Sequence, residues 1–373
     1  MSRRTMLPPI MALLQAASAG RRDLRLSAFD EAQVCWVVER GLGPLLHYST
    51  TFDAAAAIAP SWPLLQATHL TAQVLSGEQL DAMTEIIDAC AGHTPPLTLL
   101  KGISICDQYY PQPCLRPMRD IDFLVDEVDR PVVESILFKL GYRQQSQKSP
   151  QFFERHHHSM PFYHPQRGVW IEVHRRLFSG HQNVATDPVF SLDRVKQQLR
   201  PSEFQGRMVY RLSKELQIVY ISAHWCLGPT IVDGLIAMLD ALYLLRNPEE
   251  ELRWELILHW LHGSTTSRYL CLVLAHLQKY QMVDIPLEIL KKIPSGQRYV
   301  ETLNVRILQT LIDRYLGEGK DFGPHCTLED FNHVWRILLS PGSPMNNLIL
   351  VMRYFLRLRT RLYSLKRVLE LRR

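Results

Sequence analysis

The stretch DIDFLV at residues 120–125 places two carboxylates two positions apart inside an apolar, β-prone run. Side chains alternate between the two faces of a strand, so Asp120 and Asp122 are predicted to share a face while the apolar residues between them anchor the other. Neighbouring like charges repel, and a divalent cation relieves that repulsion by drawing hard oxygen ligands together. The stretch therefore predicts a strand that carries a metal site.

A second alternating stretch, VWIEVH at residues 169–174, supplies a third carboxylate. Glu172 and His174 fall on one face of this predicted strand. If the two strands are neighbours, Glu172 would join Asp120 and Asp122 in holding one or two Mg²⁺ (or Mn²⁺) ions, which suits in-line displacement at phosphorus. The alternative is a pair of half-buried strands with solvated outer faces. Acidic residues are depleted from strand interiors, which argues against it.

The order of these motifs resembles the poorly characterised bacterial nucleotidyltransferase family of the polymerase-β-like superfamily. The resemblance rests on Leu-Lys-Gly at 100–102, an arginine shortly before Asp-x-Asp, and Glu-x-His at 172–174, and it covers about residues 98–176 with weaker similarity to about 261. It implies an α+β fold with a small mixed sheet, Mg²⁺ bound by three carboxylates, and transfer of a nucleoside monophosphate from an NTP. By position, those three carboxylates are Asp120, Asp122 and Glu172.

The turn that would receive the triphosphate follows a short strand expected at residues 97–100. By the resemblance, Gly102 matches the glycine of that turn, although the broader superfamily usually has Gly-Ser or Gly-Gly there and a shorter gap to the aspartate pair. Lys101 is expected to contact phosphate as a point charge, or else to be a solvated loop lysine. A helix from about residue 103 to 110 would offer its first amides to phosphate. Ser104 either donates its hydroxyl to phosphate or caps this helix.

Other polar residues each have two interpretations. Arg116 and Arg119 either clamp the triphosphate or balance the acidic patch. His174 either orients Glu172 or contacts the nucleotide, unless it is a hydrogen-bonded structural histidine. The run of three histidines at 156–158 is expected at the surface, because consecutive residues of a strand or a loop are not expected to face one ion together. Asp240 lies in an apolar helix, and we expect it to pair with His224 or to contact the nucleotide base.

The pattern divides the chain into four regions. Residues 1–95 read as an N-terminal helical region, 96–187 as the nucleotidyltransferase core, 188–345 as a C-terminal helical domain and 346–373 as a basic amphipathic tail. Strands are expected near 152–163 as well as at 169–174, and 188–211 is a transition. The tail could bind an anionic partner such as a lipid surface, nucleic acid or an acidic protein, or it could be a solvated helix that covers the core.

Composition sets outer limits. The chain has 373 residues, of which 46% are hydrophobic and 21% charged, and a net charge of +5 that permits nucleic-acid binding without demanding it. Seven scattered cysteines predict reduced thiols and a cytoplasmic location. Residues 7–19 faintly imitate a signal peptide, but no apolar run is long enough to predict a transmembrane segment.

These observations favour a Mg²⁺-dependent enzyme that moves NMP from an NTP to an unknown hydroxyl acceptor, which could be a protein, a small molecule, a sugar or an RNA end. One alternative is a non-catalytic nucleotide- or partner-binding module with the same fold. A glycosyltransferase also uses Asp-x-Asp, but it would need a nucleotide-binding sheet of about 100 residues ahead of that motif. A metal-dependent nuclease would need the carboxylates but not the triphosphate turn.

Overall fold

A computed structural model of the chain describes residues 7–154, 156–180, 184–227, 231–248, 250–264 and 266–293. The basic tail expected at 346–373 lies outside the described residues, as does the last part of the helical domain expected at 188–345. Within the described ranges the protein combines helices with one mixed sheet, and this confirms the α+β class predicted from the sequence.

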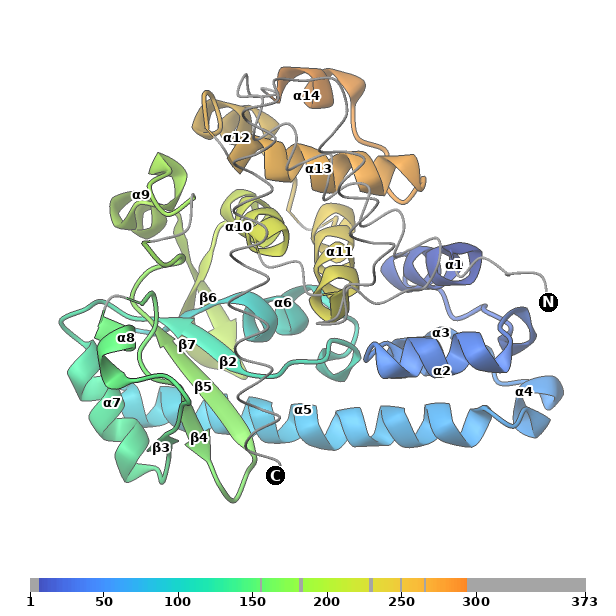
Figure 1. Cartoon of the computed structure of the whole chain (residues 1–373), viewed down its shortest axis with the longest axis horizontal. Coiled ribbons are helices and arrows are strands. Elements are labelled where there is room, and N and C mark those ends of the chain that lie inside the picture. The colour runs from blue at the N-terminus through green and yellow to red at the C-terminus, as the bar shows by residue number, and fades with distance from the viewer. Residues whose placement is uncertain are drawn as a thin grey trace, which may run out of the picture. The chain divides into compact units, whose positions relative to one another are not determined.

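The sheet has seven strands in the order β3-β4-β5-β2-β1-β7-β6 (Figure 1). Its central strand β2 is parallel to β5 and antiparallel to β1, which is in turn parallel to β7. The strands are β1 Thr98–Leu99, β2 Ile121–Leu124, β3 Arg143–Gln144, β4 Phe162–His164, β5 Val169–His174, β6 Leu199–Phe204 and β7 Arg207–Leu212.

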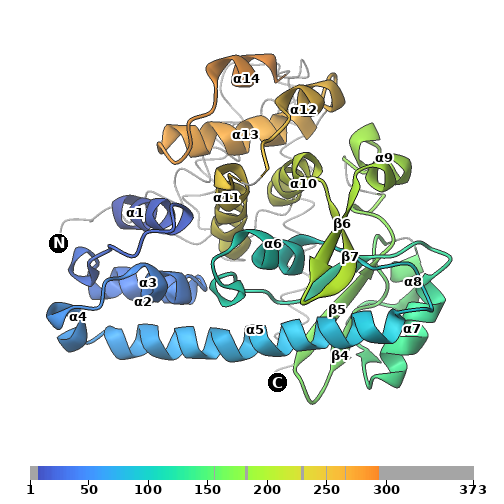
Figure 2. The same cartoon turned by 180° about the vertical axis from the view of Figure 1, so that it is seen from behind.

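One face of the sheet forms the main core against the long helix α5, Trp62–Cys90 (Figure 2). The apolar side chains of β2 and β5 point to this face and are fully buried: Ile121, Phe123, Ile171 and Val173. Burying each stabilises the fold by roughly 2 kcal/mol relative to exposure. The alternation of the two strands then forces Asp122 and Glu172 onto the opposite face, toward the helices that follow the sheet.

Helices precede the sheet, as predicted, and residues 7–95 contribute no strand to it. The glycosyltransferase alternative needed a sheet in this region, so the fold disagrees with it. The apolar segment that imitates a signal peptide forms α1, which packs against α3 and α11, and the hydroxyl of Tyr243 donates to the carbonyl of Ala17. The helices are α1 Leu7–Ser18, η1 Leu26–Ala28, α2 Glu31–Glu39, α3 Gly43–Ser49, α4 Ala54–Ile58 and α5.

The remaining helices follow β1 in the chain. They are α6 Lys101–Tyr109, η2 Pro113–Leu115, α7 Arg130–Lys139, α8 Pro150–Glu154, η3 Pro188–Phe190, α9 Leu192–Gln197, α10 Lys214–Leu227, α11 Ile231–Arg246, α12 Trp254–Trp260, α13 Thr266–Lys279 and α14 Leu287–Lys292. In the described part of the chain, no helix is both long and apolar enough to cross a membrane.

Two segments differ from the prediction. The strand expected from 152 is instead helix α8, and strand β4 begins only at Phe162. The transition expected at 188–211 contains the hairpin β6–β7, which extends the sheet by two strands. Its turn is Gln205-Gly206, with φ of +49° and +75°, the two positive values that a tight hairpin turn requires.

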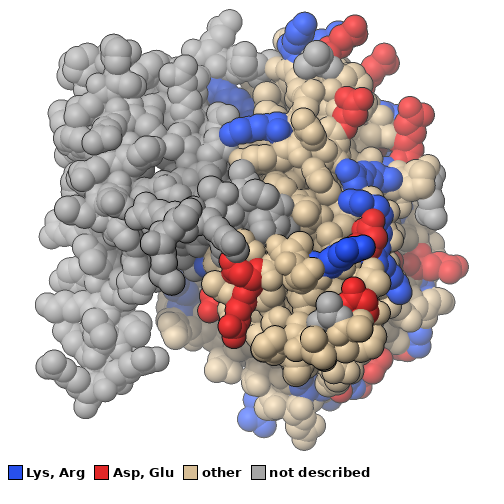
Figure 3. All heavy atoms as spheres, turned by 90° about the vertical axis from the view of Figure 1, so that its right-hand side faces the viewer, with Lys and Arg blue, Asp and Glu red and all other residues tan. Residues whose placement is uncertain are grey.

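Charged side chains are mixed rather than segregated on the face shown in Figure 3. Lys and Arg are interspersed there with Asp and Glu over the part that the structure describes. This fits the modest net charge of +5 and gives this face no broad basic surface for nucleic acid.

Candidate metal and nucleotide site

Strands β2 and β5 run side by side and bring two of the three predicted carboxylates together. Their parallel register places Asp122 directly opposite Glu172, and Leu124 opposite His174. The side chains of Asp122, Glu172 and His174 each offer a ligand atom, and these atoms all lie within 4.8 Å of one another. Two carboxylates and an imidazole at this spacing form a donor set that suits a divalent cation.

His174 organises the two carboxylates. Its Nε2 lies 2.7 Å from Oδ1 of Asp122 and 3.4 Å from Oε2 of Glu172. Burial acts to lower the pKa of His174, as does Lys101, but its bonds to the two carboxylates outweigh them and raise that pKa. His174 therefore contacts both carboxylates, and it lies closer to Asp122 than to Glu172.

Lys101 lies at the junction of β1 and α6 and reaches the same carboxylates. Its Nζ is 2.7 Å from Oδ1 of Asp122 and 4.0 Å from Oε2 of Glu172. Its backbone φ of +43° is unusual for a residue with a side chain and marks local strain of the kind found at functional sites. Burial acts to lower the pKa of Lys101, but Asp122 raises it, so the ammonium stays charged.

Burial alone would raise the pKa of Asp122, yet Lys101 and His174 hold it well below its usual range. Burial also acts against the charge of Glu172, and the hydrogen bond from His174 overcomes it, so that its pKa is lowered. Both carboxylates are therefore ionised at neutral pH, the state in which they would bind a cation.

Asp120 lies at the edge of this cluster rather than inside it. It sits at a bend just before β2, is partly exposed, and is not one of the residues whose ligand atoms lie within 4.8 Å of one another. Burial, followed by the negative charges of Asp122 and Glu172, raises its pKa to about 7. Burial and these two like charges disfavour the ionised form of Asp120, and a bound divalent cation would favour it. The residues present therefore fit such an ion.

Close packing in the structure explains why position 102 is a glycine, a reason that the resemblance does not give. A Cβ at this position would lie 2.4 Å from Nη1 of Arg116 and 2.9 Å from the side chain of Met118. Arg116 itself is held by Asp240 of α11, with Nε and Nη2 at 2.9 and 2.8 Å from the two carboxylate oxygens. Tyr110 donates its hydroxyl to the same carboxylate at 2.7 Å.

Asp240 thus fixes α11 to the segment between α6 and β2. Its partners are Arg116 and Tyr110, and not His224 as expected from the sequence. His224 is exposed. With its guanidinium engaged by Asp240, Arg116 acts in this structure as a tie between elements rather than as a group turned toward phosphate. Ser104 lies within α6, where its hydroxyl is 3.4 Å from the side chain of Gln108 rather than at a cap, and Arg119 is exposed.

Two buried residues near the site escaped the sequence reasoning. Tyr220 of α10 lines a small cavity together with Lys101 and Ser104, and its hydroxyl is buried without a hydrogen-bond partner among the described residues. Arg211 of β7 is 1% exposed and donates to the carbonyls of Ser104 (2.6 Å) and Glu203 (3.0 Å) and to Asp107. The apolar periodicity of α10 accounts for Tyr220 as a packing residue, so its position in the sequence gives no sign of a site.

The histidine run at 156–158 is not simply at the surface. His158 is 7% exposed, its Nε2 lies 3.5 Å from Oε1 of Glu172, and the rings of His157 and His174 are 5.0 Å apart. The expectation that these rings cannot converge was wrong, because the chain bends at 156 and 157 instead of continuing as a strand.

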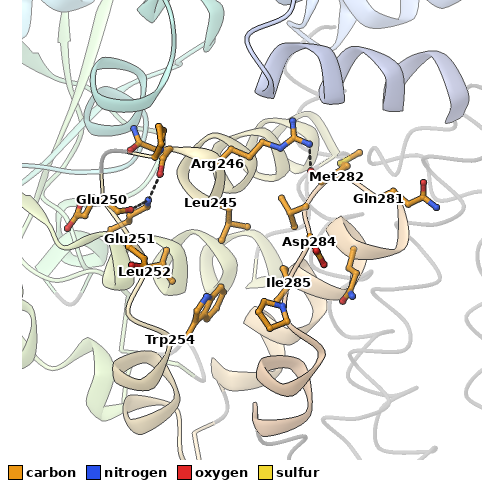
Figure 4. A pocket seen from close by; sticks show the side chains of 16 residues that line it. Leu245, Arg246, Glu250, Glu251, Leu252, Trp254, Gln281, Met282, Asp284 and Ile285 are labelled. Carbon is orange, nitrogen blue, oxygen red and sulfur yellow. Dashed lines mark hydrogen bonds between the residues drawn. The ribbon is translucent and has the colours of Figure 1, made fainter.

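A separate cavity of about 890 Å³ is lined by residues of α10, α11, α12 and α13 and of the segments that follow α11 and α13 (Figure 4). Its wall includes Leu245, Leu252, Trp254 and Ile285, and Arg246 crosses it to the carbonyl of Met282. None of the candidate site residues lines this cavity. The chemistry suggested by the carboxylates therefore belongs to the sheet and not to this hollow.

The fold and the site together define a mixed-sheet protein with a carboxylate–histidine cluster suited to a divalent cation. The sequence matches the family described as uncharacterised nucleotidyltransferase over residues 30–281, and the chain belongs to that family. The match extends beyond the motifs to most of the helices that precede and follow the sheet in the sequence. No curated protein and no solved structure matches the chain.

Proposed function

We propose that this protein is a metal-dependent nucleotidyltransferase that moves NMP from an NTP to a hydroxyl group of an acceptor. The observation that carries the proposal is the register of β2 and β5, which sets Asp122 opposite Glu172 while Lys101 and His174 converge on Asp122. Membership of a nucleotidyltransferase family supports the same reaction class.

Asp122 and Glu172 would hold Mg²⁺ or Mn²⁺, with Asp120 completing the set from the edge of the cluster. When bound, the ion supplies charge neutralisation and polarisation of the phosphoryl oxygens. His174 keeps both carboxylates oriented through its Nε2. These residues therefore act by positioning and electrostatics, which dominate catalysis of phosphoryl chemistry.

The triphosphate would lie at the start of α6. This helix begins at Lys101, and the first N–H groups of any helix lack intrahelical acceptors, which makes them anion ligands. The ammonium of Lys101 adds a positive charge there. The hydroxyl of Tyr220, which has no hydrogen-bond partner in the described part of the chain, is a donor close by. In the transfer, the acceptor oxygen bonds to the α-phosphorus, the bond to the pyrophosphate oxygen breaks, and the hydroxyl proton passes to a carboxylate of the site.

The test incubates the purified full-length protein with each α-labelled NTP, Mg²⁺ or Mn²⁺, and cell lysate. We expect label on a protein, a small molecule, a sugar or RNA, and no transfer from a γ-labelled NTP. Asp122→Asn should reduce labelling at least about 100-fold, the usual scale for losing a key electrostatic group. Glu288→Gln, at an exposed position of α14, is the matched control and should label normally.

Each contrary result has a meaning. Equal labelling by Asp122→Asn and the wild type would remove the site assignment. Nucleotide binding without any transfer would favour the non-catalytic module, and cleavage of labelled nucleic acid without NTP use would favour a nuclease.

A further inference from the structure

The loop that carries His156, His157 and His158 is held rigidly beside β5. The amide of Arg175 donates to the carbonyl of His157 at 2.9 Å, and the amide of Ser159 donates to Val173 at 2.9 Å. The guanidinium of Arg175 donates to the carbonyls of Phe153 at 2.7 Å and His156 at 2.8 Å. The backbone that presents the three imidazoles is therefore fixed from both ends.

The three rings converge, and two of them are oriented by a hydrogen bond at Nδ1. One nitrogen of each imidazole lies within 4.8 Å of one nitrogen of the other two. Nδ1 of His157 is 2.5 Å from the hydroxyl of Ser179, and Nδ1 of His158 is 2.6 Å from the carbonyl of Ser159. A carbonyl only accepts hydrogen bonds, so Nδ1 of His158 carries the proton and Nε2 keeps its lone pair. That Nε2 lies 3.5 Å from Oε1 of Glu172.

We propose that His156, His157 and His158 form a second cation site, for a transition metal of the Zn²⁺ class, bordered by the carboxylate of Glu172. Imidazole nitrogen suits Zn²⁺, Co²⁺ and Ni²⁺, whereas Mg²⁺ prefers oxygen, so this site differs in chemistry from the neighbouring carboxylate cluster. Ligating histidines commonly donate their second ring N–H to a carbonyl or hydroxyl, and His157 and His158 have such partners. Tetrahedral bonding at about 2.0 Å needs ligand nitrogens about 3.3 Å apart, so the rings would close slightly around the ion.

The site does not depend on nucleotidyl transfer. Its histidines belong to a loop before β4, while the proposed catalytic carboxylates belong to β2 and β5. The two groups adjoin at Glu172, which lies next to His158, and at His174, whose ring lies next to that of His157. A protein without transferase activity could still bind the metal, and the reverse also holds.

The test adds Co²⁺ alone to the full-length protein after chelator treatment, with Mg²⁺ in excess to occupy oxygen sites. We expect one Co²⁺ per chain with the visible absorption of a nitrogen-rich tetrahedral site. His157→Ala/His158→Ala should weaken binding by at least about 100-fold, since even second-sphere changes at metal sites cost 10- to 100-fold. Asp122→Asn and His262→Ala, the latter at an exposed histidine, should each bind within about threefold of the wild type.

A measurement without variants guards against misfolding of the double mutant. Zn²⁺ added to the wild-type protein should protect residues 156–158 from diethyl pyrocarbonate, detected by peptide mass spectrometry, and should leave the exposed His93 and His262 reactive. The proposal is overturned if Zn²⁺ gives no such protection, if the double variant binds Co²⁺ like the wild type, or if Asp122→Asn alone abolishes binding.

Discussion

Gly102 lies so close to Arg116 that a side chain at this position would collide with it. In Gly102→Ala the new Cβ would meet Nη1 of Arg116 at 2.4 Å, and that guanidinium cannot move away freely because Asp240 holds it at two points. We expect the free energy of unfolding to fall by about 1–3 kcal/mol, as for an overpacked core. Urea denaturation measures this change.

Gly77 provides the matched control. It lies inside α5, and a Cβ there would meet nothing within 4 Å. Gly77→Ala should raise the free energy of unfolding by about 0.4–1 kcal/mol, because alanine loses less backbone entropy in a helix. If both variants were stabilised alike, the packing of Arg116 would not be the reason for glycine at 102.

The raised pKa of Asp120 predicts a pH dependence of folding. With a pKa of about 7 in the folded protein and about 3.9 when unfolded, Asp120 contributes stability at low pH that is lost as the pH rises from about 4 to 7. In chelator-treated protein, Asp120→Asn should therefore raise the free energy of unfolding by about 2–4 kcal/mol at pH 8 and change it little at pH 4. Urea titrations at both pH values measure it, with the exposed Asp284→Asn as control. A benefit at pH 4 equal to that at pH 8 would contradict the raised pKa of Asp120 in the folded protein.

At the scale of elements, the pair of Arg116 and Asp240 ties α11 to the segment before β2. Both side chains are largely buried, at 12% and 3% exposure. Asp240→Ala would leave the guanidinium of Arg116 and the hydroxyl of Tyr110 buried without their acceptor, and we expect a loss of about 3–5 kcal/mol in the free energy of unfolding. Chemical denaturation measures the loss.

The exposed pair of Arg207 and Asp88 has nearly the same geometry, with two bonds of 2.7 and 2.8 Å. Water screens this pair, so Asp88→Ala should change stability little. The comparison isolates the effect of burial. Equal losses in Asp88→Ala and Asp240→Ala would show that burial is not what makes the second pair important.

The elements that the sequence predicted best are those whose pattern reflects local geometry. In β2 and β5 the acidic residues alternate with buried apolar residues, so this pattern identified both strands. The hairpin β6–β7 was missed although Gln205-Gly206 is a turn signal, because Pro201 and the charged residues of β6 resemble a loop.

The parts of the site that sequence could not supply depend on contacts between distant segments. The bonds from His174 to Asp122 and from Arg116 to Asp240 join residues 52 and 124 positions apart, and no local pattern encodes them. The three histidines converge because the chain bends at 156–157, and no glycine or proline at these positions predicts the bend. The sequence could identify the acidic residues of the site, because they alternate with apolar residues.

At the scale of the whole molecule, the acidic cluster should link folding to cation binding. Strands β2 and β5 are central in the sheet and share its core with α5, so an ion bound between Asp122 and Glu172 stabilises the folded state as a whole. A ligand at 100 times its dissociation constant adds about 2.7 kcal/mol, which raises the melting temperature of a protein of this size by several degrees. We expect that rise when Mg²⁺ or Mn²⁺ is added to chelator-treated protein.

Glu172→Gln decides whether the rise comes from this cluster. Glutamine keeps the shape of the side chain but removes the charge that the ion needs, so the melting temperature of this variant should become independent of Mg²⁺ and Mn²⁺. Glu288→Gln should keep the full response because its side chain is exposed on α14. A melting temperature that rises equally in Glu172→Gln and in the wild type would place the stabilising ion elsewhere. In that case the ion pairs of Asp122 and Glu172 with Lys101 and His174 would have to explain, without a metal ion, why the two carboxylates lie side by side.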